Sequence, residues 1–281
     1  MMSRMKTVCL ALAGLGIAAV AQSAHADQWD NIMKNKELKC ATFADVPPFA
    51  APDPKTREMV GFDVDMCRAL AKHFGVPAAI TPVSVEARVP EVEMGRVDVT
   101  IANLAYTTSR AKEIDFSDPY YVAKEMLAVH TNDPATSPAE VKGKRLSAAK
   151  GSTSELSINL NGSQPVTFQD TGSAYMALEQ NKVVGMVANT MTITKLVNDS
   201  QKSGVPLKMI KEPMLLEPIA IGIKKGEEKL RDKVNEALYA MDKDGEIDAM
   251  WNKWLGPNTE FKMTRDEHVQ PITAIHFTPI P

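Results

Sequence analysis

Along this chain, short apolar runs typical of buried strands alternate with segments whose apolar residues recur at helical spacing. Residues 38–43 form a short apolar run typical of a buried strand, whereas residues 63–74 carry apolar side chains at helical spacing and end at Gly75. Further strands are expected at 79–83, 97–102, 145–148, 183–188, 207–210 and 219–224. Further helices are expected at 86–94, 152–160, 172–180, 191–199, 227–242 and 246–254. This alternation predicts parallel α/β sheets whose faces are covered by helices.

One pattern occurs twice. Residues 95–103 and 181–189 each follow an expected helix, cross a short apolar strand and end in Ala-Asn before a polar turn. The repeat can arise by chance, because α/β units share such patterns. Read structurally, it indicates two similar lobes, each with a strand that ends in an asparagine, Asn103 or Asn189. Ligands of open α/β sheets bind outside the carboxyl ends of strands, so two facing lobes would place one asparagine on each wall of a cleft.

The first 26 residues have the three-part order of a secretory signal peptide. Arg4 and Lys6 give a positive start, residues 8–21 are apolar, and Ala24 and Ala26 supply the small residues that a signal peptidase reads. The alternative is a membrane anchor, but the apolar run is shorter than the roughly 20 residues that a bilayer requires. We therefore expect an exported protein whose mature form begins near Asp27.

The composition of the chain argues against several classes of binding partner. The chain has 32 basic and 35 acidic residues, and removal of residues 1–26 takes away two basic ones and leaves a mild net negative charge. A chain with this charge lacks the excess of basic residues that is typical of proteins that bind nucleic acid or anionic lipid. About 255 mature residues suffice for one large domain or two ordinary ones. Two cysteines remain, Cys40 and Cys67, which predicts either one disulfide or two buried thiols. No metal or cofactor is expected, since no Cys-x-x-Cys or paired-histidine spacing occurs.

Two short segments have polar chemistry at expected helix starts. The segment 107–110, Thr-Thr-Ser-Arg, combines capping hydroxyls and free N–H groups with Arg110, which can grip a carboxylate with two nitrogens. The alternative is a capped surface helix with a solvated arginine. The segment 150–154, Lys-Gly-Ser-Thr-Ser, suits a small anion or polar ligand, although it is not a phosphate loop. The histidines lie in no recognisable nucleophile or metal motif, and no carboxylate pair stands out by its spacing.

Three further motifs carry a resemblance to a known family. Gly-Phe-Asp-Val-Asp at 61–65, Ile-Asp-Phe-Ser-Asp-Pro-Tyr-Tyr at 114–121 and Lys-Trp-Leu-Gly at 253–256 occur in order over residues 38–256. In this respect the chain resembles the periplasmic polar-amino-acid-binding proteins, which are the family 3 solute-binding components of ABC importers. The resemblance implies an α/β, bilobal periplasmic-binding-protein fold, with two parallel-rich sheets flanked by helices and a ligand cleft between the lobes.

The same resemblance implies how the chain is divided. It should cross between the lobes twice, near residues 125–128 and 217–220. Lobe 1 would then consist of residues 27–125 and 219–256, and lobe 2 of residues 126–218. Residues 257–281 form a proline-rich tail that we expect to be irregular or loosely docked.

The resemblance also implies a set of ligand contacts. Arg110 falls on the family arginine that clamps the α-carboxylate of the ligand, and Thr107 lies in the same turn. Ser152 and Thr153 fall on the lobe 2 loop that also contacts the carboxylate. Arg88 stands where relatives that bind acidic side chains have an arginine. Cys40 and Cys67 match paired cysteines of one branch of the family.

Three positions depart from the family pattern. Asn189 stands where an aspartate usually pairs with the ligand ammonium, and an asparagine can accept from that group without supplying charge. Ala105 replaces a common serine or threonine, and Val46 replaces an aromatic residue that often packs on the ligand. Phe49 or Tyr106 could supply the ring contact instead, or Phe49 could simply pack in the core. These departures place an ordinary α-amino acid in question.

Three functions remain open on this basis. The leading hypothesis is a monomeric periplasmic carrier without catalysis, which captures a small carboxylate-bearing solute and delivers it to an ABC permease in the inner membrane. Arg88 and Asn189 together favour an acidic amino acid or a dicarboxylate. The second hypothesis is an enzyme similar to the cyclohexadienyl dehydratases, which act on prephenate or arogenate, but the sequence offers no candidate for the general acid. The third is a sensor domain.

Overall fold

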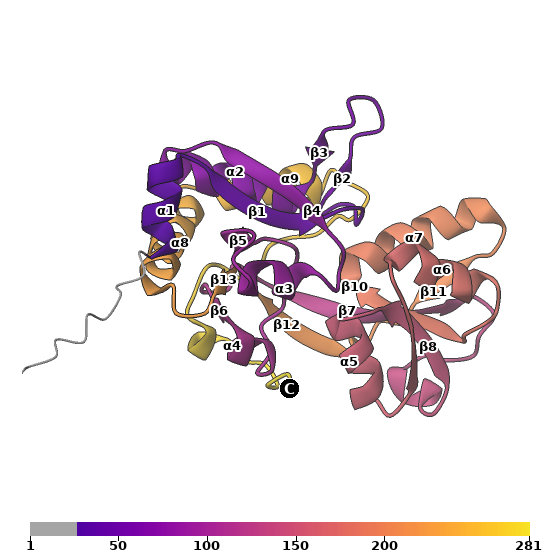
Figure 1. Ribbon diagram of the computed structural model, residues 1–281. Helices are drawn as coiled ribbons and strands as arrows, with labels where there is room; N and C mark the ends of the chain where they lie inside the picture. Colours follow the sequence, from indigo (N-terminus) through magenta and orange to yellow (C-terminus); the bar gives the residue numbers. More distant parts are fainter. Residues whose placement is uncertain (1–26) are drawn as a thin grey trace, which may run out of the picture.

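The computed structural model describes residues 27–281, so the expected signal peptide lies outside the described residues. Figure 1 shows two lobes joined by the long strand β7 (Tyr121–His130) and its neighbour β12 (Leu215–Ile219). Both sheets contain parallel and antiparallel strands and are flanked by helices, which confirms the expected bilobal α/β fold. No helix in the described part of the chain is long and apolar enough to cross a membrane.

Lobe 1 contains a five-stranded sheet in the order β4-β1-β5-β13-β6. Its strands are β1 (Leu38–Phe43), β4 (Ala78–Val83), β5 (Val99–Thr100), β6 (Ile114–Phe116) and β13 (Gly222–Lys224), and a separate hairpin pairs β2 (Ala51–Pro52) with β3 (Met59–Val60). Its helices are α1 (Gln28–Asn35), α2 (Phe62–Phe74), α3 (Arg88–Glu93), α4 (Arg110–Glu113), α8 (Glu228–Lys243) and α9 (Glu246–Trp254).

Two apolar cores cover the opposite faces of the lobe 1 sheet. The alternation of side chains along β1 divides its residues between them, so that Cys40 packs in the larger core with α2, α8 and α9, while Ala41 packs in the smaller core beside α3. Cys40 is bonded to Cys67 of α2, with an S–S distance of 2.00 Å, which confirms the disulfide. This bond ties the first strand of the sheet to the helix that covers it.

Lobe 2 contains the sheet β11-β7-β10-β8-β9, with β12 paired to β7. Besides β7 and β12, its strands are β8 (Arg145–Ala149), β9 (Gln164–Phe168), β10 (Gly185–Asn189) and β11 (Leu207–Met209). Its helices are α5 (Thr153–Leu160), α6 (Thr171–Glu179), α7 (Thr190–Ser203) and the short 3-10 turn η1 (Pro138–Val141). Strands β8, β9 and β10 run parallel, so their carboxyl ends meet at the edge that faces lobe 1.

The two crossing strands belong to both lobes. Along β7, Tyr121 and Ala123 pack in the larger core of lobe 1, whereas Met126 and Ala128 pack in a core of lobe 2. Strand β12 runs antiparallel beside β7, with Glu217 opposite Ala123. The sequence pattern predicted one strand at 219–224, but the chain breaks there into β12 and β13, because it leaves the lobe 2 sheet after residue 219 and enters the lobe 1 sheet at residue 222.

The tail after α9 has one short 3-10 turn, η2 (Ile272–Ala274), and is otherwise irregular. It is not loosely docked. The side chain of Arg265 is 2 % exposed, pairs with Asp242, and donates to Asp248 at 2.7 Å and to the carbonyl of Tyr120 at 3.0 Å. Further along, the carbonyl of Ile280 accepts from a lobe 1 backbone N–H at 2.8 Å. The buried Arg265 therefore anchors the tail to lobe 1, although the composition of the tail alone indicated an irregular or loosely docked segment.

Candidate ligand-binding cleft

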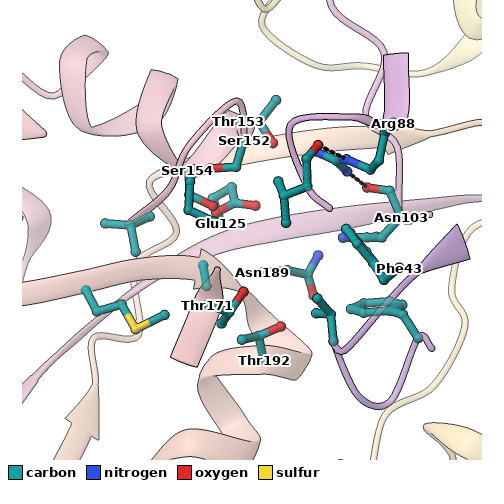
Figure 2. A pocket seen from close by; sticks show the side chains of 17 residues that line it. Phe43, Arg88, Asn103, Glu125, Ser152, Thr153, Ser154, Thr171, Asn189 and Thr192 are labelled. Carbon is teal, nitrogen blue, oxygen red and sulfur yellow. Dashed lines mark hydrogen bonds between the residues drawn. The ribbon is translucent and has the colours of Figure 1, made fainter. Parts of the chain in front are cut away.

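The two lobes meet around a cavity of about 50 Å³, here called the central cavity. Figure 2 shows the side chains that line it, which come from both lobes and from β7. Six of the eight residues expected at the site are among them: Phe49, Arg88, Asn103, Ser152, Thr153 and Asn189. The structure therefore brings together positions that lie up to 140 residues apart in the sequence.

The other two expected residues, Thr107 and Arg110, line a neighbouring pocket of about 300 Å³, here called the outer pocket. The two spaces share Ser152 and Thr153, so they lie on either side of the loop that begins α5. Tyr106, which sequence reasoning considered for a ring contact, lines neither space and packs instead on Phe116, with ring centroids 5.3 Å apart. Phe49 both lines the central cavity and is fully buried.

Arg110 joins the lobes. One of its terminal nitrogens, Nη1, donates to the carbonyl of Ala105 at 2.9 Å, and the other, Nη2, donates to the carbonyl of Gly151 in lobe 2 at 3.1 Å. The hydroxyl of Thr107 accepts from the backbone N–H of Arg110 at 3.1 Å and fixes the turn. A second bridge between the lobes joins Lys150 to Glu86 at 2.8 Å. The lobes are therefore in a closed arrangement.

Arg88 is buried, and much of its hydrogen-bonding capacity is used within lobe 1. Its Nε donates to the carbonyl of Val85 at 2.8 Å, and its Nη1 donates to the carbonyls of Ala102 and Asn103 at 2.9 and 3.3 Å. The guanidinium also lies 5.1 Å from the ring centre of Phe43. Burial, followed by the positive charge of Arg110, lowers the pKa of Arg88 to about 9, so it stays largely charged at neutral pH. Arg88 therefore fixes the loop after β5, and its remaining terminal nitrogen, Nη2, is left to border the cavity.

Asn189 presents a donor to the cavity. Its Oδ1 accepts from the backbone N–H of Met191 at 3.0 Å and so caps the start of α7. Because that N–H requires an acceptor, the oxygen faces the helix and the amide nitrogen Nδ2 points away from it. Within the described residues, Nδ2 is buried and has no hydrogen-bond partner. The expected contact of Asn189 with a ligand ammonium stays a prediction: in this arrangement Oδ1 already caps α7, and among the described residues Nδ2 is the side-chain atom without a partner.

Two buried carboxyl groups that the sequence analysis did not single out lie at the crossing strands. Glu125 of β7 lines the central cavity and is 2 % exposed, and Glu217 of β12 is 1 % exposed. Glu217 is opposite Ala123, two residues from Glu125, so both side chains leave the same face of the strand pair. The signal that could have found them is a lone carboxylate within each of two mostly apolar strands.

Burial dominates the ionisation of this pair. It raises the pKa of Glu125 well above the usual range, and the adjacent Glu217 raises it further, while the hydroxyl of Ser154 lowers it. Burial also raises the pKa of Glu217, but the Thr153 hydroxyl, Glu125 and the cations Arg110 and Arg88 oppose that rise. Burial therefore favours the protonated form most strongly at Glu125, and the two carboxyls titrate as a coupled pair beside the arginines.

The described residues contain no group of three or more His, Cys, Asp and Glu side chains arranged to hold a metal ion. What the cleft offers is a set of fixed donors and acceptors. Arg88, Arg110 and Asn189 supply donors, and Glu125 supplies a carboxyl group. Such a set of groups suits a small polar molecule.

Known proteins resemble the chain over most of its length. The glutamine-binding protein GlnH of an ABC transporter from Bacillus subtilis is 26% identical over 80% of this chain and 83% of its own. The L-cystine-binding protein TcyJ of Escherichia coli is 28% identical over 75% of this chain and 79% of its own. A solved structure of an ancestral arginine-binding protein bound to arginine superposes with a TM-score of 0.72 at 33% identity, and covers 79% of this chain and 99% of that one.

The family model for bacterial extracellular solute-binding proteins, family 3, matches residues 38–257, which include both lobes and both crossing strands. The fold, the closed cleft and these similarities agree, and they place this chain in family 3 of the bacterial extracellular solute-binding proteins.

Proposed function

We propose that this protein captures an amino acid, or a close relative with an α-carboxylate, between its lobes in the periplasm and delivers it to an ABC permease. The observation that carries the proposal is the position of Arg110, which extends from lobe 1 to the backbone of the lobe 2 loop at Gly151. A carboxylate at this point would meet the guanidinium and the hydroxyl-rich start of α5 together. The similarity to the glutamine-, cystine- and arginine-binding proteins supports this ligand class.

Capture would require the lobes to open. The central cavity, at about 50 Å³, is much smaller than the several hundred cubic ångströms of typical small-molecule sites. In the open form, we expect the bonds from Arg110 to Gly151 and from Lys150 to Glu86 to be broken. A ligand that contacts both lobes then favours the closed form, because only that form offers all its contacts at once. The permease would recognise this closed form.

The side chain of the ligand would face Arg88. Since Nε and Nη1 of this arginine already bind backbone carbonyls, one terminal nitrogen is left for a ligand oxygen. An acidic or carboxamide side chain suits that single donor. Within the proposed ligand class, the site should therefore prefer acidic or polar amino acids.

The experiment is a thermal-shift screen of the mature chain against the common L-amino acids, L-cystine, opines and dicarboxylates. A ligand that binds the folded form raises the melting temperature by mass action, and titration calorimetry then gives its affinity. An L-amino acid should give the largest shift. If none of the amino acids or carboxylates changes the melting temperature, the proposed ligand class is wrong.

One observation favours a second candidate, the dehydratase. Glu125 borders the cavity, and burial together with Glu217 raises its pKa, which suits a general acid for the departure of a hydroxyl group. Incubation of the protein with prephenate, followed by detection of phenylpyruvate, tests this candidate. Turnover that is lost in Glu125→Gln would establish the enzyme, and a rate equal to the uncatalysed one would exclude this reaction.

A further inference from the structure

The lining of the central cavity contains a single acidic side chain, that of Glu125. Its other polar groups near the ligand position are mainly donors or hydroxyls, and Asn189 and Arg88 add donors only. A zwitterionic ligand brings a cationic nitrogen that needs an anionic partner once it is removed from water. Within the described lining, Glu125 is the group that can meet this need.

The position of Glu125 suits this role. Its Oε2 is fully buried and has no hydrogen-bond partner among the described residues, which leaves an acceptor unsatisfied. Figure 2 shows the side chain next to Ser154, on the opposite side of the cavity from Arg88 and Asn103. Glu125 also lies at the point of β7 where the chain passes from one core to the other. A cation bound there contacts the hinge itself.

We propose that Glu125 binds the cationic nitrogen of the ligand, that Glu217 positions and tunes it from the second crossing strand, and that the site therefore selects molecules with both an amine and a carboxylate. This inference rests on the proposed function, because it assigns the second charge of the same ligand. It adds a specificity-determining residue at the hinge, in a cleft where Asn189, at the end of the lobe 2 strand, brings no negative charge and uses its Oδ1 to cap α7.

If Glu125 binds the ligand cation, ligand binding is coupled to the release of the proton of Glu125. The groups that face the pair are Arg88 from α3, Arg110 from α4 and the hydroxyls of Thr153 and Ser154 from the start of α5. Before binding, burial and the adjacent Glu217 favour the protonated form of Glu125 by raising its pKa. The ligand arrives as an ammonium ion and keeps its three protons, while Glu125 gives up its proton to solvent and becomes the anionic partner. One proton is therefore released to the buffer for each ligand bound.

The test uses matched pairs of ligands in which a hydroxyl group replaces the α-amine: L-glutamate with L-2-hydroxyglutarate, L-phenylalanine with L-phenyllactate, and L-arginine with L-argininic acid. The wild type should bind the amino acid of a responding pair more tightly than the hydroxy acid by about tenfold to hundredfold, as expected for a hydrogen bond to a charged group. Glu125→Gln should lose that difference by weakening the amino acid alone.

Proton release gives a second readout. Calorimetry in phosphate and in Tris at the same pH, below the midpoint of Glu125, should show release approaching one proton per ligand in the wild type and almost none in Glu125→Gln. Glu217→Gln should keep the preference for the amine but shift the pH at which binding is half lost to a lower value, because it removes a neighbouring negative charge. Glu212→Gln, which changes an exposed glutamate, is the matched control and should behave as the wild type.

The outcomes separate the two proposals. Equal affinity and equal proton release in the wild type and Glu125→Gln, or equal affinity for amine and hydroxy acid in the wild type, overturns the role of Glu125 and leaves the amino-acid carrier intact. If the wild type binds no member of the three pairs and no compound of the wider screen, the proposed function fails, and the assignment of Glu125 fails with it.

Discussion

Arg110 and Gly151 are hydrogen-bonded across the cleft, with Nη2 of the arginine 3.1 Å from the glycine carbonyl. Two consequences follow for the ligand-free closed form. The bond holds the guanidinium in place before a ligand arrives, and it gives the closed form one contact that a ligand carboxylate must replace or share. Gly151 has a φ of +72°, and an added Cβ there would lie 3.2 Å from the Glu86 backbone, so a side chain would strain both the turn and the closed cleft.

We expect Arg110→Ala to weaken amino-acid binding by at least about a hundredfold, because it removes the only expected two-nitrogen grip on the α-carboxylate. Arg110→Lys should recover only part of this loss, since an ammonium cannot contact both carboxylate oxygens with the same geometry. Titration calorimetry with the amino acid found in the screen measures both. Arg231→Ala on α8, away from the cleft, is the control. Near-normal affinity in Arg110→Ala would contradict the assignment.

Asn189→Asp tests the orientation of the amide. The aspartate can still cap α7 with one oxygen, while its second oxygen replaces the donor Nδ2 with a charged acceptor. We expect Asn189→Asp to restore amino-acid binding in the Glu125→Gln background, because it returns an anion to the cavity. Asn189→Ala should instead lower the free energy of unfolding by about 1 kcal/mol through loss of the cap. Absence of rescue in the double variant would argue that the second oxygen does not reach the ligand.

The ligand-free protein should become less stable as the pH rises. Burial raises the pKa of Glu125 and Glu217 in the folded chain above their unfolded values, so the folded state binds more protons between those values. The free energy of unfolding therefore falls as the pH increases from about 4.5 through the raised pKa values. Glu125→Gln removes one titrating group, and its urea midpoint should exceed that of the wild type at pH 7.5 and approach it near pH 4.

This stability gain should accompany the loss of ligand affinity in the same variant, which is the trade-off expected at a binding site that holds an unfavourable group. Glu212→Gln again serves as the control and should change neither quantity. A Glu125→Gln variant that is less stable than the wild type at pH 7.5 would indicate that the carboxylate stabilises the closed fold instead.

Loss of the disulfide should weaken lobe 1 without changing ligand selectivity. The bond joins residues 27 apart, and closing a loop of that size contributes about 3–4 kcal/mol in the chain-entropy model. The double variant Cys40→Ala/Cys67→Ala should lose stability of that order in urea unfolding. Its affinity for the amino acid should stay within about twofold at 25 °C, because the bond lies in the core and outside the lining of the central cavity. An equal loss of affinity would show that the bond also positions the site.

The tail should contribute to stability through Arg265. Its side chain is 2 % exposed and contacts Asp242 and Asp248, so Arg265→Ala would leave a partly buried carboxylate without its partner. Breaking a buried pair typically costs about 3 kcal/mol or more. Thermal melting measures the loss, and limited proteolysis should show earlier cleavage after residue 256. Lys262→Ala, at an exposed tail position, is the control and should melt like the wild type.

Sequence reasoning reached the alternation of strands and helices, the repeated lobe and the disulfide, because each depends on a local pattern or on two isolated residues. It placed one strand across the break between β12 and β13, since residues 219–223 carry no polar side chain and only the position of the two lobes decides where the chain leaves one sheet. It expected an irregular or loosely docked tail and missed the docking, because a single buried arginine has no periodic signature. These differences arise from contacts between segments far apart in the chain.

Prediction of the site divides in the same way between what local patterns indicate and what contacts between distant segments decide. The positions of Arg88, Asn103 and Asn189 at strand ends and helix starts follow from the order of elements, and all three line the cavity. Which atom of Asn189 faces the ligand depends on the N–H of Met191, and how much of Arg88 is free depends on three carbonyls of neighbouring loops. Glu125 and Glu217 lie 92 residues apart, and only the antiparallel register of β7 and β12 makes them neighbours.

Strand β13 has a further consequence for the order in which the chain can fold. It lies between β5 and β6, so β6 joins the lobe 1 sheet only through residues 222–224. Lobe 2 draws its whole sheet from residues 121–219, which are contiguous and include all its pairing partners. As the chain emerges during synthesis or export, lobe 2 can therefore assemble first, while β6 of lobe 1 must wait for a segment made about a hundred residues later.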